Sequence, residues 1–343
     1  MDLTLTIRKR FYFLPVIPFA YCLLFSGMLF SQNTTIKGFV AAETMVTDGK
    51  LSFGFSEQDL FITSQLSDRV SFLGETVFKY DPNSHSEFSV SIERVVAKFN
   101  ITGNHNILVG KHHTPINYWN DTYHHGRLFF PTIERPLLFT AGIVPLHTTG
   151  IDFQGMNLGK IKFGYDLMIG NGLGSSEVAD NDKHKSIVAA VHIKPVDRLR
   201  IGTTYYNDII SKNAAIHGRV FDRKVKQQLF SGSVAYFGKK FEVLTEGTLG
   251  INNADSIGRK NAWAGYMYGG YRINEKWVPY FRVDLLRYDK GTYFFPKNNA
   301  ASFILGVRCQ LNYLAVIKLE YEHRDFEITG TGDRVMAQVA IGF

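Results

Sequence analysis

Residues 334–343 read RVMAQVAIGF and end the chain on an aromatic side chain, Phe343. One set of alternate positions is apolar throughout, whereas the other includes a charged residue, an amide and small residues beside one methionine. The first set is Val335, Ala337, Val339, Ile341 and Phe343, and the second is Arg334, Met336, Gln338, Ala340 and Gly342. Because successive side chains of a β-strand point to opposite faces, this segment predicts a strand with one apolar and one polar face.

The same alternation recurs along the chain, for example in residues 161–170 and 199–206. From residue 34 onward, alternating segments of roughly ten residues are separated by turn residues, as in membrane barrels. Aromatic residues make up 14% of the chain and charged residues 20%, which suits sheets with one apolar and one polar face. Alternation alone also fits a soluble sandwich, whose apolar faces would meet in a core.

The connections between these segments alternate between short and long. Short turns are predicted at residues 67–69, 102–104, 159–160, 196–198, 238–240 and 274–276 and around Asn312. Longer polar stretches are predicted at residues 81–87, 171–184, 211–223, 252–260 and 288–298. Membrane barrels have short turns at one end and long loops at the other, which sandwiches have no reason to show. The pattern predicts an all-β fold, a transmembrane antiparallel β-barrel of about 16 strands. Residues 48–56 fit either a loop or a strand.

The first 31 residues have the composition of a signal peptide, which leaves residues 32–343 for the barrel. Arg8, Lys9 and Arg10 precede an apolar run from Phe11 to Phe30. A retained helical anchor is the alternative, but prolines interrupt the run. We therefore expect export to the outer membrane of a Gram-negative bacterium. The formal net charge of +7 comes from basic residues spread along the chain, so no nucleic acid partner is expected.

One predicted connection, residues 114–147, is too long for an ordinary loop, and loops of this length are usually functional. It is the third connection on the external side. We expect it to fold into the barrel and form the pore constriction. The residues expected to contact solutes are Tyr118, Trp119, Asp121, Tyr123, His124, His125, Arg127, Glu134 and Arg135.

Residues 109–139 read VGKHHTPINYWNDTYHHGRLFFPTIERPLLF and resemble the phosphate-selective porin family. The matching positions are Gly110, Lys111, Pro115, Ile133, Glu134 and Arg135. The sequence departs from the family pattern at Asn117, where Gly is common, and in its doubled histidines. The resemblance implies a sixteen-stranded trimeric porin with an inward third loop. The terminal strand ending in Phe343 resembles the signal recognised by the barrel-assembly machinery, which is therefore an expected partner.

The polar faces of the clearer strands supply the residues expected to line the lumen. These are Lys162, Asp166, Arg200, Arg282, Asp284, Arg308, Lys318 and Glu320. Across all the charged residues on the polar faces of these strands, positive and negative charges are nearly balanced, and within the long loop Arg127 and Arg135 are offset by Asp121 and Glu134. Mixed charge predicts a weakly selective, water-filled pore, whereas a basic ladder would predict a phosphate channel. We therefore expect passive diffusion of small hydrophilic solutes and ions, with membrane lipid around the barrel and no cofactor.

Two other functions compete with a general porin. A solute-specific channel for phosphate or other anions is the first. An outer-membrane enzyme of the lipase type is the second, and it would need Ser231 or Ser233 beside a histidine. The doubled histidines at 112–113 and 124–125 also invite a metal site. Adjacent residues of a strand point to opposite faces, so the doubled histidines are not expected to bind a metal. No catalytic residue is expected either, because nothing in the sequence brings Ser231 or Ser233 to a histidine.

Overall fold

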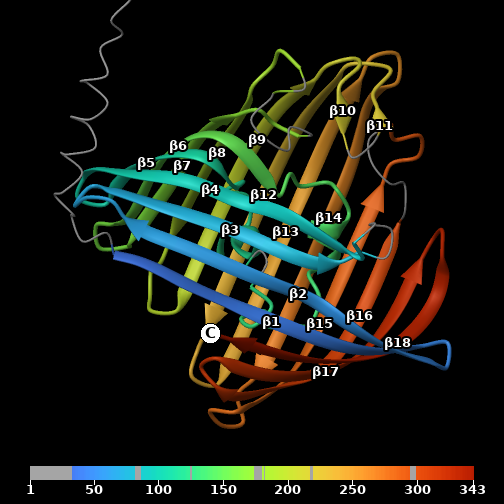
Figure 1. The fold of residues 1–343 in the computed structure, drawn as a ribbon. Coiled ribbons are helices and arrows are strands. Elements are labelled where there is room, and N and C mark those ends of the chain that lie inside the picture. The colour runs from blue at the N-terminus through green and yellow to red at the C-terminus, as the bar shows by residue number, and fades with distance from the viewer. Residues whose placement is uncertain are drawn as a thin grey trace, which may run out of the picture.

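The computed structural model describes residues 33–81, 86–123, 126–173, 180, 182–216, 219–293 and 299–343. In this part of the chain, sixteen strands form one closed antiparallel barrel (Figure 1). The prediction of an all-β barrel of about 16 strands is therefore confirmed. The predicted signal peptide lies outside the described residues. Among the residues described, no helix is long and apolar enough to cross a membrane.

Each strand pairs with the next along the chain, except that a small hairpin stands between β9 and β12. The barrel strands are β1 (Asn33–Thr47), β2 (Lys50–Gln65), β3 (Val70–Tyr80), β4 (Phe88–Thr102), β5 (His105–His113), β6 (His147–Leu158), β7 (Phe163–Gly170), β8 (Ser186–Ile193), β9 (Leu199–Ile210), β12 (Val225–Phe237), β13 (Phe241–Ala254), β14 (Gly258–Tyr271), β15 (Trp277–Tyr288), β16 (Ala300–Asn312), β17 (Ala315–Phe326) and β18 (Gly330–Gly342). The hairpin consists of β10 (Ala215–Ile216) and β11 (Arg219–Val220), and two short helices, α2 (Tyr118–Thr122) and α3 (Leu137–Thr140), lie between β5 and β6.

The barrel closes where β1 pairs with β18. The backbone N–H of Gly38 donates to the carbonyl of Phe343 at 3.0 Å, and the N–H of Phe343 donates back at 2.9 Å. A Cβ at Gly38 would lie 2.6 Å from Cζ of the Phe343 ring. Glycine at this position therefore leaves room for the terminal aromatic ring against the first strand.

The connections differ between the two ends of the barrel. We call the end that carries Phe343 the turn end; its connections span residues 66–69, 103–104, 159–162, 194–198, 238–240, 272–276 and 313–314. The opposite loop end carries residues 48–49, 81–87, 114–146, 171–185, 211–224, 255–257, 289–299 and 327–329. The long third connection was thus placed correctly.

Two boundaries at the loop end differ from the expectation. The ambiguous residues 48–56 form a two-residue hairpin turn followed by β2, because Asp48 and Gly49 adopt positive φ values of 51° and 73°. The predicted loop 252–260 is mostly strand, since Asn252 pairs with Lys260 across a connection of only residues 255–257. Residues 252–260 were predicted as a loop because the ends of β13 and β14 carry polar side chains.

The strand faces follow the predicted alternation. In β7, Leu167 and Ile169 are exposed on the outer surface, whereas Asp166 and Met168 are buried inside. In β18, Val339 and Ile341 are exposed and Gln338 is buried. The outer surface is therefore apolar, and the polar residues point inward.

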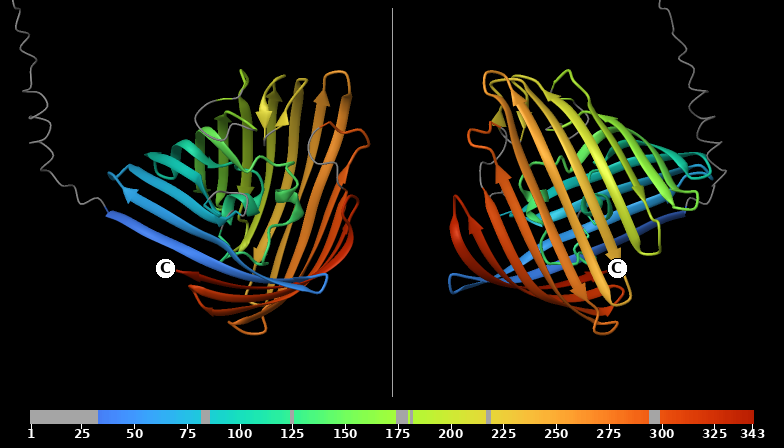
Figure 2. Two further views of the ribbon diagram at one scale, coloured as in Figure 1. Left: turned by 45° about the vertical axis from the view of Figure 1, so that its right-hand side comes forward. Right: turned by 180° about the vertical axis from the view of Figure 1, so that it is seen from behind.

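Residues 114–146, which we call the inward loop, enter the barrel (Figure 2). Shortly before this loop, within β5, Gly110 has a φ of 130°, a conformation that other residues rarely adopt. A Cβ at this position would lie 2.0 Å from the carbonyl oxygen of Val95 on β4. Glycine at this position therefore lets β5 lie close against the backbone of β4 just before the chain leaves the barrel wall.

Candidate functional site

The inward loop carries its own apolar core, which packs on the inner wall of the barrel. Ile116, Trp119, Phe130 and Leu138 are at most 1% exposed. The Trp119 ring lies 5.0 Å from the ring of Phe130 and 6.0 Å from that of Tyr266 on β14, measured between centroids. Burying a large apolar side chain contributes roughly 1.5 to 3 kcal/mol. Apolar packing therefore holds this loop inside the lumen.

The start of the loop is held by Glu246 on β13. Its carboxylate accepts the backbone N–H groups of Tyr118 and Trp119, the latter at 3.2 Å. The Tyr266 hydroxyl donates to the same carboxylate at 2.5 Å. The preceding residue, Asn117, has a φ of 65° and a ψ of 159°, a strained conformation that is essentially restricted to glycine.

The middle of the loop is held by Arg282 and Asp284 on β15. The Arg282 guanidinium donates to Thr132 Oγ1 at 2.6 Å and to the carbonyl of Glu134 at 2.7 Å. It also donates to Asp284 at 2.8 Å, and Asp284 accepts the backbone N–H of Leu137 at 3.2 Å. Both side chains are almost fully buried. This ion pair therefore fastens loop backbone to the barrel wall.

Lys318 and Glu320 on β17 also hold the middle of the inward loop. The Lys318 ammonium donates to the carbonyls of Arg127 and Thr132 at 2.7 and 3.1 Å. Glu320 accepts the backbone N–H of Ile133 at 2.7 Å. These residues were predicted to line a wet lumen beside one another. In the structure both are buried and bind loop backbone, so their charges are used for anchoring.

Among the described residues of the loop, Arg127 and Asp121 pair with charges on the barrel wall. Arg127 lies 3.3 Å from Glu43 on β1 and 3.0 Å from Glu57 on β2. Burial alone would lower the pKa of Arg127, but these two carboxylates outweigh it and raise that pKa above its ordinary value. Asp121 lies 2.7 Å from Arg200 on β9. The expected offset of Arg127 by Asp121 is wrong, because the two residues face different walls.

Glu134 and Arg135 also turn toward the wall. Glu134 pairs with Arg334 on β18 and lies 3.5 Å from Arg324 on β17. Arg135 is partly buried, and burial lowers its pKa. Glu134 is therefore held by two neighbouring strands of the wall, β17 and β18.

The aromatic residues of the loop contact one another. The Tyr118 and Tyr123 rings meet edge-on with centroids 5.8 Å apart, and the Arg200 guanidinium carbon lies 5.3 Å above the Tyr118 ring. Tyr123 is partly buried, and this burial raises the pKa of its hydroxyl well above the ordinary value. His124 and His125 lie outside the described residues.

Lys162 is not a lumen residue. It lies in the turn before β7, has a φ of 48°, and is exposed, with its ammonium 3.4 Å from Asp197 in a neighbouring turn. The prediction was wrong because the turn extends over residues 159–162 and the strand starts one residue later. Asp166, by contrast, points inward and accepts a hydrogen bond from Gln154 at 2.9 Å.

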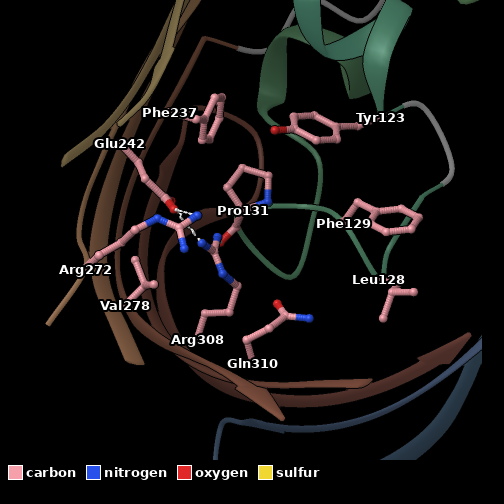
Figure 3. A pocket seen from close by; sticks show the side chains of 10 residues that line it. All are labelled: Tyr123, Leu128, Phe129, Pro131, Phe237, Glu242, Arg272, Val278, Arg308 and Gln310. Carbon is pink, nitrogen blue, oxygen red and sulfur yellow. Dashed lines mark hydrogen bonds and ion pairs between the residues drawn. The ribbon is translucent and has the colours of Figure 1, made fainter. Parts of the chain in front are cut away.

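Space remains between the loop and the wall at the turn end. A cavity of about 500 Å³ borders Tyr118, Asp121, Asp166, His192 and Arg200. A second pocket of about 160 Å³ lies between the tip of the loop and strands β13–β16 (Figure 3). Its lining residues are Tyr123, Leu128, Phe129, Pro131, Phe237, Glu242, Arg272, Val278, Arg308 and Gln310. Of these, the sequence prediction included Tyr123 and Arg308.

Ser231 and His113, which a lipase site or a metal site would use, contact other side chains. Ser231 shares a hydrogen bond of 2.8 Å with the hydroxyl of Thr248. The His113 ring lies on the ring of His147, with centroids 5.5 Å apart. Within the described ranges, no group of three or more His, Cys, Asp or Glu residues could hold a metal ion.

No protein-family model and no curated protein sequence matches the chain. Solved structures do match. An anion-selective porin from Comamonas acidovorans aligns with a TM-score of 0.68 at 11% identity, over 91% of this chain and 100% of that chain. The outer-membrane protein OmpT of Vibrio cholerae, in its trimer form, gives 0.65 at 12% identity, over 91% and 99%. The outer-membrane channel DcaP of Acinetobacter baumannii gives 0.65 at 12%, over 91% and 97%. At these identities the likeness is one of fold, and this chain shares the closed barrel of those outer-membrane proteins.

Proposed function

We propose that this chain is an outer-membrane porin that allows small hydrophilic solutes to diffuse passively through a water-filled lumen. The observation that carries the proposal is the inward loop, which narrows a closed barrel and is fixed to its wall at Glu246, Arg282 and Lys318. A loop held by backbone hydrogen bonds on several strands gives a constriction of constant shape. Solutes then pass through the hydrated space beside it, and no energy source is needed.

Charge selectivity should be weak in such a pore. Arg127, Asp121 and Glu134 each pair with an opposite charge on the barrel wall. Paired charges separated by less than a Debye length, about 8 Å at physiological ionic strength, largely cancel for a passing ion. A general porin is therefore favoured over a phosphate-specific channel.

Localisation and assembly belong to the same proposal. The outward apolar side chains would contact membrane lipid, residues 1–31 would direct export, and Phe343 would be recognised by the barrel-assembly machinery. A homotrimer is proposed because the Vibrio cholerae OmpT that shares this fold occurs in a trimer form. Enzyme activity is not proposed, since the contact of Ser231 with Thr248 supplies no base.

Planar-bilayer recording tests this function. The purified barrel should conduct in KCl, and deletion of residues 119–129 should raise its single-channel conductance because the tip of the constriction is removed. The deletion ends before Phe130, so that residues 131–137 can keep their contacts with Arg282 and Asp284. A folded barrel that carries no current would refute the porin proposal. Unchanged conductance in a correctly folded deletion variant would show that the inward loop is not the constriction.

A further inference from the structure

The pocket between the loop tip and strands β13–β16 has two chemically different walls (Figure 3). Arg272, Arg308 and Gln310 present polar groups from the barrel wall. Leu128 and Phe129 lie across the pocket from them on the inward loop. Phe129 is 61% exposed, whereas Trp119, Phe130 and Phe139 of the same loop are buried. A pocket with opposed polar and apolar walls suits a solute that has both characters.

The polar wall carries one unbalanced positive charge. Glu242 is fully buried, and its carboxylate lies 2.5 Å from Arg272 and 2.8 Å from Arg308. The Tyr268 hydroxyl donates to its second oxygen at 2.7 Å. Two guanidinium groups thus share one carboxylate whose oxygens are already occupied. The excess charge of this wall is positive, so it would attract an anion.

Arg272 can direct that charge at a solute. A guanidinium has five N–H donors in a planar fork. Among the described residues, Arg272 contacts Glu242 through Nη2, and a third of its side chain is exposed. Arg308, in contrast, is held by Glu242 and by the loop carbonyl of Pro131 at 3.4 Å. The planar fork of Arg272 matches a carboxylate, which can accept two parallel hydrogen bonds.

We infer that this pocket is a binding subsite for small amphiphilic carboxylates, with the carboxylate on Arg272 and an apolar body against Leu128 and Phe129. The inference rests on the proposed pore, which would deliver the solute. A cavity of about 160 Å³ is of the size that holds a single benzene ring. Inorganic phosphate fits less well for two reasons. It has no apolar part to contact the apolar half of the lining, and its negative charge exceeds the one unbalanced positive charge of the polar wall.

Benzoate, benzyl alcohol and acetate test the subsite as probes. The full barrel in detergent micelles is titrated by calorimetry, and the same probes are added in planar bilayers while block of the KCl current is recorded. Benzoate should bind and block more strongly than the other two. Arg272→Gln should weaken benzoate binding by about tenfold or more, because a hydrogen bond to a charged group is lost. Lys276→Gln is the matched control, since it removes an exposed cation of the same turn that does not line the pocket.

Each outcome bears on the inference. Benzyl alcohol binding as tightly as benzoate, or Arg272→Gln binding benzoate unchanged, would overturn it. An equal loss in Lys276→Gln would also overturn it, because the effect would then be general surface charge. A barrel that conducts KCl but does not bind benzoate refutes the subsite alone. A barrel that binds benzoate through Arg272 without conducting refutes the pore and supports the subsite.

Discussion

Replacing Arg282 with Met should release the middle of the inward loop while leaving the barrel intact. Arg282 bonds Thr132, the carbonyl of Glu134 and Asp284 from a position that is 2% exposed. Methionine fills similar space without any donor. The substitution leaves Asp284 as a buried carboxylate that has lost its cation.

The cost follows from that unpaired charge. Breaking a buried ion pair by removing one partner costs about 3 to 5 kcal/mol. Each 1.4 kcal/mol is about tenfold in an equilibrium, so local opening of the loop should become at least about a hundredfold more frequent. The strand pairing of β15 with β14 and β16 does not involve the side chain. Folding of the barrel should therefore be retained.

Hydrogen exchange and single-channel recording measure the effect. The amides of Ile133 and Leu137, which bond to wall carboxylates, should exchange at least about a hundredfold faster in Arg282→Met. The open-channel current should become noisier, because the constriction then fluctuates. Arg287→Met is the control, since Arg287 lies on the same strand and is exposed. Wild-type exchange and wild-type noise in a folded Arg282→Met barrel would refute the anchoring argument.

Three further predictions concern the seam, the loop entrance and selectivity. Deleting Phe343 should reduce the amount of barrel in the outer membrane more than it alters conductance, as judged by heat-modifiable migration on gels; normal membrane levels would count against this role. Gly110→Ala should destabilise the barrel by about 1 to 3 kcal/mol, because alanine would have to adopt a φ of 130° against the Val95 carbonyl, and a lowered thermal transition would show it. The zero-current potential under a KCl gradient at pH 7.5 should indicate only a slight charge preference, whereas strong anion preference with block by micromolar phosphate would restore the phosphate-channel alternative.

The sequence predicted the strands because their outer and inner faces are chemically different. Val335 and Gln338 have opposite environments in the barrel, as their alternation requires. The turn before β7 was less predictable, since Lys162 has a strand-like neighbourhood and leaves the strand only through its positive φ. Asn252 shows the reverse error, a polar residue that is paired in a strand. Composition therefore describes strand interiors better than strand ends.

The candidate site was predicted only in outline. Alternation placed Lys318 on the inner face, but the carbonyl it binds belongs to Arg127, 191 positions earlier in the chain. No local pattern encodes such a contact. Glu246 was missed as a site residue for the same reason, because its partners are backbone N–H groups of Tyr118 and Trp119. The odd or even position of a residue in a strand predicts the face on which its side chain lies. Only the fold shows which segment that side chain contacts.

The seam between β1 and β18 fixes the order in which the molecule can be completed. β1 pairs with β18, the last strand of the barrel, so β1 keeps an unpaired edge until β18 is available to it. Open sheet edges pair readily with other chains. A molecule that has been exported only in part would therefore expose two unpaired strand edges to water. The time that such a molecule spends with open edges depends on how fast β1 and β18 pair. Damage to either strand would slow that pairing.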